Sequence, residues 1–270
     1  MKFAICNETF QDWPFDRACA FAAECGYQGL EIAPFTLAAR AGDVSPQQRK
    51  AICRQVQAAG LEVVGLHWLL AKTEGFHLTS ADRDVRRRTA DYLVELAQLC
   101  GDLGGRVMVL GSPLQRNLAA GMTPAQGMTY AAEVLAAVAP ELQARDVVLA
   151  LEPLGPQETN FLLTAAEAVE LIERLAVSQV RLHLDCKAMS TEAAPIVDLI
   201  RTYHPWLAHF HANDPNRQGP GFGALDFVPI FRALDEVHYD GWVSVEVFDY
   251  TPGIERLGRQ SIDYMRRCCA

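Results

Sequence analysis

Short apolar runs alternate along the chain with longer amphipathic stretches. The runs are rich in Val, Leu and Ile and are bounded by polar residues, which is typical of strands buried in a sheet. The segments between them are longer and carry apolar residues on one helical face. The pattern predicts strands at 2–6, 29–33, 62–68, 106–111, 147–152, 180–185, 207–212 and 242–247.

Helices are expected between these strands. Two of the clearest, 45–60 and 123–145, open with Ser or Thr followed by Pro, a common helix-start pattern. The other helices that the pattern predicts plainly are 82–105, 164–175, 191–203, 227–237 and 254–268. We count eight strands and eight helices in strict alternation, without a proline-rich or glycine- and serine-rich linker.

This alternation predicts an α/β fold, because strands separated by helices pair in parallel. Eight βα units in 270 residues match a (β/α)8 TIM barrel, and we expect one such domain over residues 1–270. The alternative is an open, doubly wound sheet, which more often has a glycine-rich phosphate turn after its first strand. Here the first strand is followed by NETFQDW, which contains no glycine, so the barrel is favoured.

Composition and charge narrow the classes of partner. The net charge is −9 and the longest basic run is Arg86–Arg88, which disfavours binding to a nucleic-acid backbone. No apolar run is long enough to span a membrane, and the N-terminus turns polar too soon for a signal peptide. The eight cysteines are scattered without a Cys-x-x-Cys pair, as expected for reduced thiols. We therefore expect a cytoplasmic protein without nucleic-acid or membrane partners; a homodimer and a homotetramer are both compatible with the sequence.

Four consecutive strands end in side chains that bind metals. The run VVLAL at 147–151 leads directly into Glu152, and burying an unpaired carboxylate there would cost several kcal/mol. The next three strands end in Asp185, His211 and Glu246. Because the carboxyl ends of barrel strands meet at one mouth, we expect these four side chains to converge. Taken singly, each could equally be a helix cap, a solvated loop residue or a core residue.

Three carboxylates and one imidazole form a donor set dominated by hard oxygen ligands. Such a set favours one divalent ion, with Mn²⁺ first and Mg²⁺, Co²⁺ or Zn²⁺ as alternatives. His183 and His209 lie two residues before Asp185 and His211, on the same strand faces. We expect both histidines one layer below the metal, where they orient its ligands; ordinary polar core residues are the alternative.

The segments around these residues resemble a known family. LEPLGPQETN, HLDCKAM, HFHANDPNRQGPGFG and VSVEVF resemble the xylose isomerase-like TIM-barrel sugar isomerases and epimerases, most of all the ketose 3-epimerases of the D-tagatose 3-epimerase type. The resemblance implies that the four strand-end residues hold one divalent metal. It also implies that Glu158 and Arg217 contact a small carbohydrate substrate. One position departs from the pattern: Ala188 stands where these epimerases usually carry a substrate-contacting histidine. Lys187 could compensate, although nothing in the sequence shows it.

The expected chemistry is proton transfer at a carbon beside a ketone. A divalent ion that binds two neighbouring oxygens of a hydroxy-ketone stabilises the enediolate formed on deprotonation. Glu152 and Glu246 could then act as base and acid in turn, which gives epimerisation or aldose–ketose isomerisation. The alternatives are a lyase of the same family, such as a keto-inositol or dehydroshikimate dehydratase, a non-catalytic binding protein, and a DNA-repair nuclease. The nuclease is disfavoured because it would use more histidines, whereas position 188 is Ala and no Asp-x-His pair follows His211.

Other residues at the predicted barrel mouth have open interpretations. His67 and Trp68 could form a wall for the sugar, or could be barrel packing. Glu31 could bind a hydroxyl, although a surface carboxylate is favoured. Arg116, after Gly111, Ser112 and Pro113, could hold a substrate phosphate.

Overall fold

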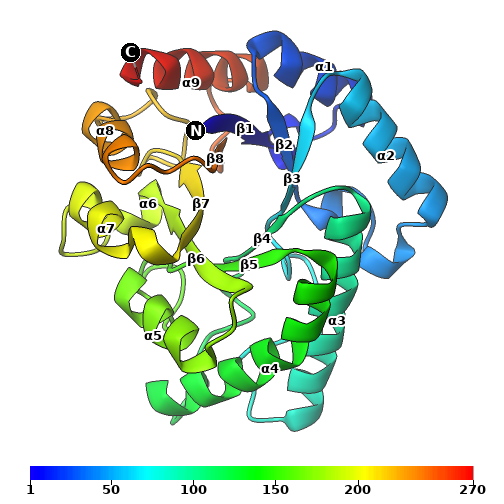
Figure 1. Ribbon diagram of the computed structural model, residues 1–270, viewed down its shortest axis with the longest axis vertical. Helices are drawn as coiled ribbons and strands as arrows, with labels where there is room; N and C mark the ends of the chain where they lie inside the picture. Colours follow the sequence, from blue (N-terminus) through cyan, green and yellow to red (C-terminus); the bar gives the residue numbers. More distant parts are fainter. Residues whose placement is uncertain (270) are drawn as a thin grey trace.

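Eight parallel strands form a closed barrel in the computed structural model, which describes residues 1–269. The strands pair in chain order and β8 closes on β1. Helices surround the barrel (Figure 1). The strands are β1 Lys2–Cys6, β2 Gly29–Ile32, β3 Glu62–Leu66, β4 Val107–Leu110, β5 Val148–Leu151, β6 Val180–Asp185, β7 Leu207–Ala212 and β8 Trp242–Val245. The predicted (β/α)8 barrel is confirmed.

The helices agree with the sequence pattern except in the loop after β6. In the described residues they are α1 Phe15–Cys25, α2 Pro46–Ala58, α3 Arg83–Asp102, α4 Pro124–Arg145, α5 Ala165–Leu175, α6 Cys186–Met189, α7 Ile196–Tyr203, α8 Val228–Glu236 and α9 Ile254–Cys268. Ser45 and Thr123 cap α2 and α4 through capping boxes. The expected helix 191–203 begins only at Ile196, because Pro195 serves as its N-cap. The one-turn helix α6 was not predicted.

Five strands end earlier than the sequence pattern indicated. β2 and β4 are shorter by one residue at this end, while β3, β5 and β8 stop at Leu66, Leu151 and Val245, so Glu152 and Glu246 are the first residues after their strands. After β3 and β5 the backbone hydrogen bonds to the neighbouring strand continue for one more residue. The amide of Glu152 still donates to the carbonyl of Leu110 at 3.3 Å, and the amide of His67 donates to Ile32 at 3.1 Å. The side chains therefore keep the orientation of the strands that precede them.

Strand alternation separates two kinds of buried surface. Leu182 and Leu184 of β6, with Phe210 of β7, belong to the large apolar core that continues into the helices. The residues between them, His183 and His209, are fully buried but polar. Since successive side chains point to opposite faces of a strand, the outer face of the barrel is apolar and its interior at this level is polar. The fold therefore directs chemically active groups inward.

Two expectations from composition can be compared with the structure. The eight cysteines are free thiols. Within residues 1–269, none of the helices combines the length and apolar character that a membrane span requires.

Gly65 allows the closest approach between β3 and β4. A Cβ at this position would lie 1.8 Å from the carbonyl oxygen of Val107, so the two strands would have to separate. We predict that Gly65→Ala lowers the free energy of unfolding by about 1–3 kcal/mol, the usual cost of overpacking, measured by urea denaturation. Gly101→Ala is the control, because its Cβ would meet only ordinary contacts at 3.5 Å or more in α3. Equal stability of the two variants would contradict this account of the β3–β4 contact.

Candidate metal and active site

Three of the four predicted metal ligands converge at the mouth of the barrel. Glu152, Asp185 and His211, together with His183, offer ligand atoms that all lie within 4.8 Å of one another. β6 and β7 provide the alignment, since Asp185 is the register partner of His211. All four side chains are buried.

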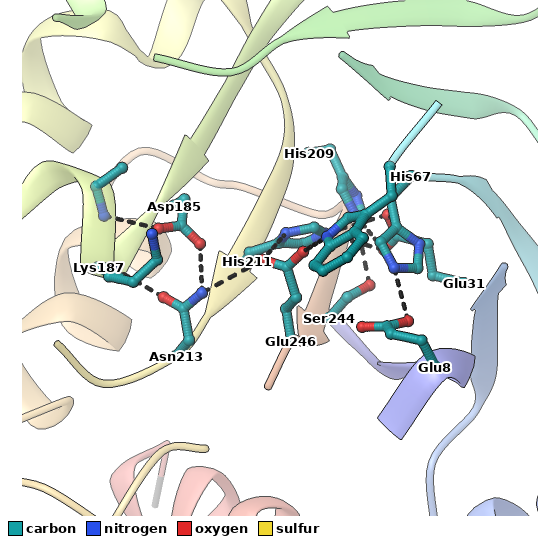
Figure 2. A network of polar contacts seen from close by, with 12 residues as sticks. Glu8, Glu31, His67, Asp185, Lys187, His209, His211, Asn213, Ser244 and Glu246 are labelled. Carbon is teal, nitrogen blue, oxygen red and sulfur yellow. Dashed lines mark hydrogen bonds and ion pairs between the residues drawn. The ribbon is translucent and has the colours of Figure 1, made fainter. Parts of the chain in front are cut away.

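Glu246 joins this cluster through hydrogen bonds. Its Oε2 lies 3.2 Å from Nδ1 of His211, and its Oε1 accepts the indole N–H of Trp68 at 2.7 Å. The side-chain amide of Asn213 donates to Asp185 and also reaches Glu246. Figure 2 shows Asn213 between the two carboxylates. The four residues expected to bind the metal are thus brought together, and their role as ligands stays a prediction.

Glu31 lies directly beneath the cluster. Its carboxylate is 2.7 Å from Nε2 of His209 and 3.1 Å from Nε2 of His211 (Figure 2). The side chain is only 1 % exposed, so the surface interpretation of Glu31 was wrong. Because Glu31 engages Nε2 of His211, the other ring nitrogen, Nδ1, faces Glu246. This is the usual way in which a carboxylate behind a histidine sets the orientation of a ligand ring.

The two other histidines of the interior are in different situations. Nε2 of His67 lies 2.7 Å from Glu8, and the His67 side chain is fully buried. His183 has no hydrogen-bond partner for either ring nitrogen within the described chain, and its ring packs edge-on against His211 with centroids 4.2 Å apart. That His183 and His209 orient the metal ligands stays a prediction.

The carboxyl groups of the cluster have strongly shifted pKa values. Burial, with the nearby charges of Glu246 and Asp185, raises the pKa of Glu152 well above its ordinary value. Burial raises the pKa of Asp185 to about 6, although Lys187 opposes the shift. Burial would also raise the pKa of Glu246, but His211 and the hydrogen bond from Trp68 bring it below the ordinary value.

These shifts describe a site that suits a cation. Three carboxylates lie close together in one buried site. Without a positive partner, their like charges disfavour ionisation of Glu152 and Asp185. A divalent cation would remove that penalty, since it favours the ionised form of each carboxylate. The donor set of Glu152, Asp185, His211 and Glu246 therefore fits a divalent metal with mostly oxygen ligands.

A cavity of about 310 Å³ opens onto two of these glutamates. Glu152, Glu246 and Glu158 line it with Trp68 and Phe248, and the loop 111–115 completes the wall. Its volume is that of a small-ligand site. Trp68 thus contributes to the cavity wall, as one interpretation of the sequence held. His67 is fully buried and is not part of this wall, so its position agrees with barrel packing instead.

The two arginines considered as substrate contacts lie away from this wall. The Arg217 side chain is exposed; its backbone carbonyl accepts the amides of Phe248 and Asp249, which ties the loops after β7 and β8 together. The Arg116 guanidinium is buried and donates to the backbone carbonyl of Glu152 at 2.6 Å. It supports the strand end and is not presented to a substrate phosphate.

The position without the expected histidine has a lysine neighbour. Asp185 caps α6 by accepting the amide of Ala188 at 2.7 Å. The ammonium of Lys187 pairs with Glu158 at 2.7 Å and lies 4.9 Å from the centre of the Phe248 ring. The predicted substrate contact Glu158 is therefore held by a cation that the sequence only suggested. The side-chain oxygen of Asn213 accepts the backbone amide of Lys187. Asn213 was not predicted from the sequence.

Fold and site together define a (β/α)8 barrel with a buried carboxylate–imidazole cluster at its mouth. The family described as Xylose isomerase-like TIM barrel matches residues 19–268, and the chain belongs to it.

Similar proteins within this family include sugar epimerases. The chain is 34% identical over 188 residues to an L-ribulose 3-epimerase of Mesorhizobium japonicum, covering 68% of this chain and 62% of the relative. It is 37% identical over 105 residues to a D-psicose 3-epimerase of Agrobacterium fabrum, covering 39% and 36%. These matches thus span less than two thirds of either relative. A crystal structure of a D-psicose 3-epimerase in the presence of D-fructose has the same fold, with a TM-score of 0.88 at 21% identity over 100% of this chain and 99% of that one.

Glu246 provides a direct test of the metal site. We predict that Glu246→Gln binds Mn²⁺ more weakly by a larger factor than the ~10–100-fold that loss of a residue behind the ligands costs, because a charged donor is lost. Metal analysis of the purified protein and titration with Mn²⁺ measure the difference. Glu170→Gln, an exposed position on α5, is the control. If Glu246→Gln retained as much metal as the control, Glu246 would not be a ligand.

Proposed function

We propose that the protein is a sugar epimerase or isomerase that depends on a divalent metal and acts on a keto sugar by proton transfer. Membership of the family and the similarity to proteins named L-ribulose and D-psicose 3-epimerase support the reaction class. The same names suggest a substrate with a ketone and an adjacent hydroxyl-bearing carbon.

One observation carries the proposal. Glu152 and Glu246 directly follow strands β5 and β8 and line the same cavity, so a substrate bound there meets carboxylates from two different strands of the barrel. Inversion at a carbon needs a base on one face and an acid on the other, and two glutamates so placed supply both. A site that only bound sugars would not require this pair.

The chain's own residues divide the remaining work. Glu152, Asp185, His211 and Glu246 would hold the metal, with Mn²⁺ as the first choice and Mg²⁺, Co²⁺ or Zn²⁺ as alternatives. When bound, the ion supplies Lewis-acid polarisation of the hydroxy-ketone oxygens. Glu158 contacts the substrate hydroxyls while Lys187 holds its carboxylate in place. Trp68 and Phe248, stacked with centroids 5.8 Å apart, exclude water and provide an apolar surface for the sugar.

Exchange of hydrogen with solvent tests proton transfer. We predict that product formed in heavy water carries deuterium at the inverted carbon, because the proton taken by one glutamate can exchange before it is returned. The substrate is the best found in a screen of ketoses, aldoses and cyclic polyols with Mn²⁺. Mass spectrometry and NMR locate the label. Glu152→Gln and Glu246→Gln should each lose about 10²–10⁴ in rate, with metal content measured alongside. Unlabelled product formed at a normal rate would indicate a hydride shift and leave both glutamates as ligands only.

Because position 188 is an alanine, we expect weak activity on simple sugars. An alanine cannot donate a hydrogen bond to the substrate oxygen that the usual histidine contacts, and the Lys187 ammonium is already paired with Glu158. We therefore expect kcat/KM on free D-fructose, D-psicose and D-tagatose to lie below about 10⁴ M⁻¹s⁻¹, the lower end of the usual range for enzymes. Efficient turnover of any of these three sugars would contradict this interpretation of position 188.

A further inference from the structure

A second cavity lies beside the catalytic cavity, at the same end of the barrel. Its volume is about 490 Å³, and it is lined by segments that follow β1, β2, β3 and β8: Glu8, Gln11, Asp12, Phe35, Thr36, Trp68, Lys72 and Tyr250. Trp68 and Lys72 line both cavities. Glu8 adjoins the metal site, since it offers an oxygen within 4.8 Å of ligand atoms of His67 and Glu246. The metal site and the acid–base pair do not account for the other residues of this lining.

Trp68 is the wall between the two cavities. Its indole N–H donates to Glu246 on the catalytic side, where the ring also stacks on Phe248. On the other side the ring packs against Phe35, with centroids 5.7 Å apart. Trp68 has a φ of +52°, which a bulky residue rarely adopts and which persists only where its surroundings hold it. The ring is thus fixed at the boundary, and the two cavities adjoin at Trp68 and Lys72, which line both.

The lining of the second cavity suits a sugar ring. Phe35, Trp68 and Tyr250 offer apolar faces for C–H groups, while Gln11 and Thr36 offer hydrogen-bond donors and acceptors for hydroxyls. The charged residues of the wall, Glu8 and Asp12 against Lys72, do not add up to a positive site. A phosphate or carboxylate is therefore disfavoured relative to a neutral, hydroxyl-rich ligand.

Glu8 gives independent support for a ligand with hydroxyl groups. The side chain is 6 % exposed and its Oε2 is engaged by His67. Its Oε1 is buried and has no hydrogen-bond partner within the described chain. Buried polar atoms are nearly always paired. Because Glu8 is part of the cavity lining, a ligand hydroxyl that displaced its neighbours at this wall could pair this oxygen.

We propose that the second cavity is a sugar subsite, and that the substrate is a keto sugar that carries a second sugar residue, as in a glycoside or disaccharide. The reacting carbon lies in the catalytic cavity beside Glu152 and Glu246, and the second residue lies against Phe35 and Tyr250. The assignment of the reacting end rests on the proposed epimerase function, whereas the subsite itself rests on the cavity and on Glu8.

Calorimetry with matched sugars tests the subsite. The Mn²⁺-loaded protein is titrated with D-fructose and with three ketose-terminated disaccharides, lactulose, isomaltulose and turanose. At least one disaccharide should bind about tenfold more tightly than D-fructose, which corresponds to about 1.4 kcal/mol. Asp12→Ala should lower the affinity for that disaccharide about fivefold more than the affinity for D-fructose. Asp240→Ala, an exposed aspartate just before β8 at the opposite end of the barrel, should change neither.

The outcomes separate the subsite from the reaction. If none of the disaccharides binds more tightly than D-fructose, or if Asp12→Ala affects both sugars equally, the second cavity is not a sugar subsite. A preference for the disaccharide that Asp12→Ala removes, found without any deuterium exchange into either sugar, keeps the subsite and overturns the epimerase. Exchange into D-fructose without a disaccharide preference keeps the epimerase and overturns the subsite.

Discussion

The carboxylate of Glu31, held between two histidines, is the contact on which the rest of the site depends. Burial would raise its pKa, but the adjacent His209 and His211 outweigh burial and hold that pKa well below its ordinary value. Burial likewise would lower the pKa of His211, while Glu31 and Glu246 bring it well above its ordinary value. Glu31 and His211 therefore each favour the charged form of the other. As a metal ligand the His211 ring would be neutral, with its Nε2 proton directed at Glu31. Removing one partner would leave an uncompensated charge in the interior, which is far more costly than losing a surface ion pair.

This contact exists because the barrel closes. Glu31 belongs to β2 and His211 to β7, and the two residues are 180 positions apart in sequence. Alternation along each strand sends Glu31, His209 and His211 into the interior, while Leu30, Ile32 and Phe210 pack outward against the helices. The apolar outer face thus holds the strands at the register that the polar interior needs. The same contact also positions the residues nearer the barrel mouth, because His211 orients Glu246 and Glu246 in turn accepts the N–H of Trp68.

Sequence reasoning predicted the elements well and the contacts poorly. Runs such as VVLAL and VRLHLD identify strands because a parallel barrel buries both faces of each strand, and the polar residues at the ends of these runs were therefore found. Glu31 was misread because a single carboxylate within GLEIA looks like a solvent-facing position of a half-buried strand. Asn213 and Lys187 could not be assigned, since their partners lie on other loops and no local pattern marks them. The helix α6 is too short for a hydrophobic period and forms because Asp185 caps it.

The Lys187–Glu158 pair closes one side of the site and leaves the other side open. Burial would lower the pKa of Lys187, but Asp185 and the hydrogen bond with Glu158 outweigh it and raise that pKa above its ordinary value. The lysine therefore remains a cation among carboxylates, which a neutral histidine at position 188 would not be. Lys187 pairs with Glu158 and lies over Phe248, so its side chain fills the space between the loops after β6 and β8. The catalytic cavity extends the other way, toward Trp68 and Lys72, where the second cavity begins. Under the proposed function, the alanine at position 188 and the second cavity would be two ends of one site, with the substrate recognised by the loops that follow β1, β2 and β3.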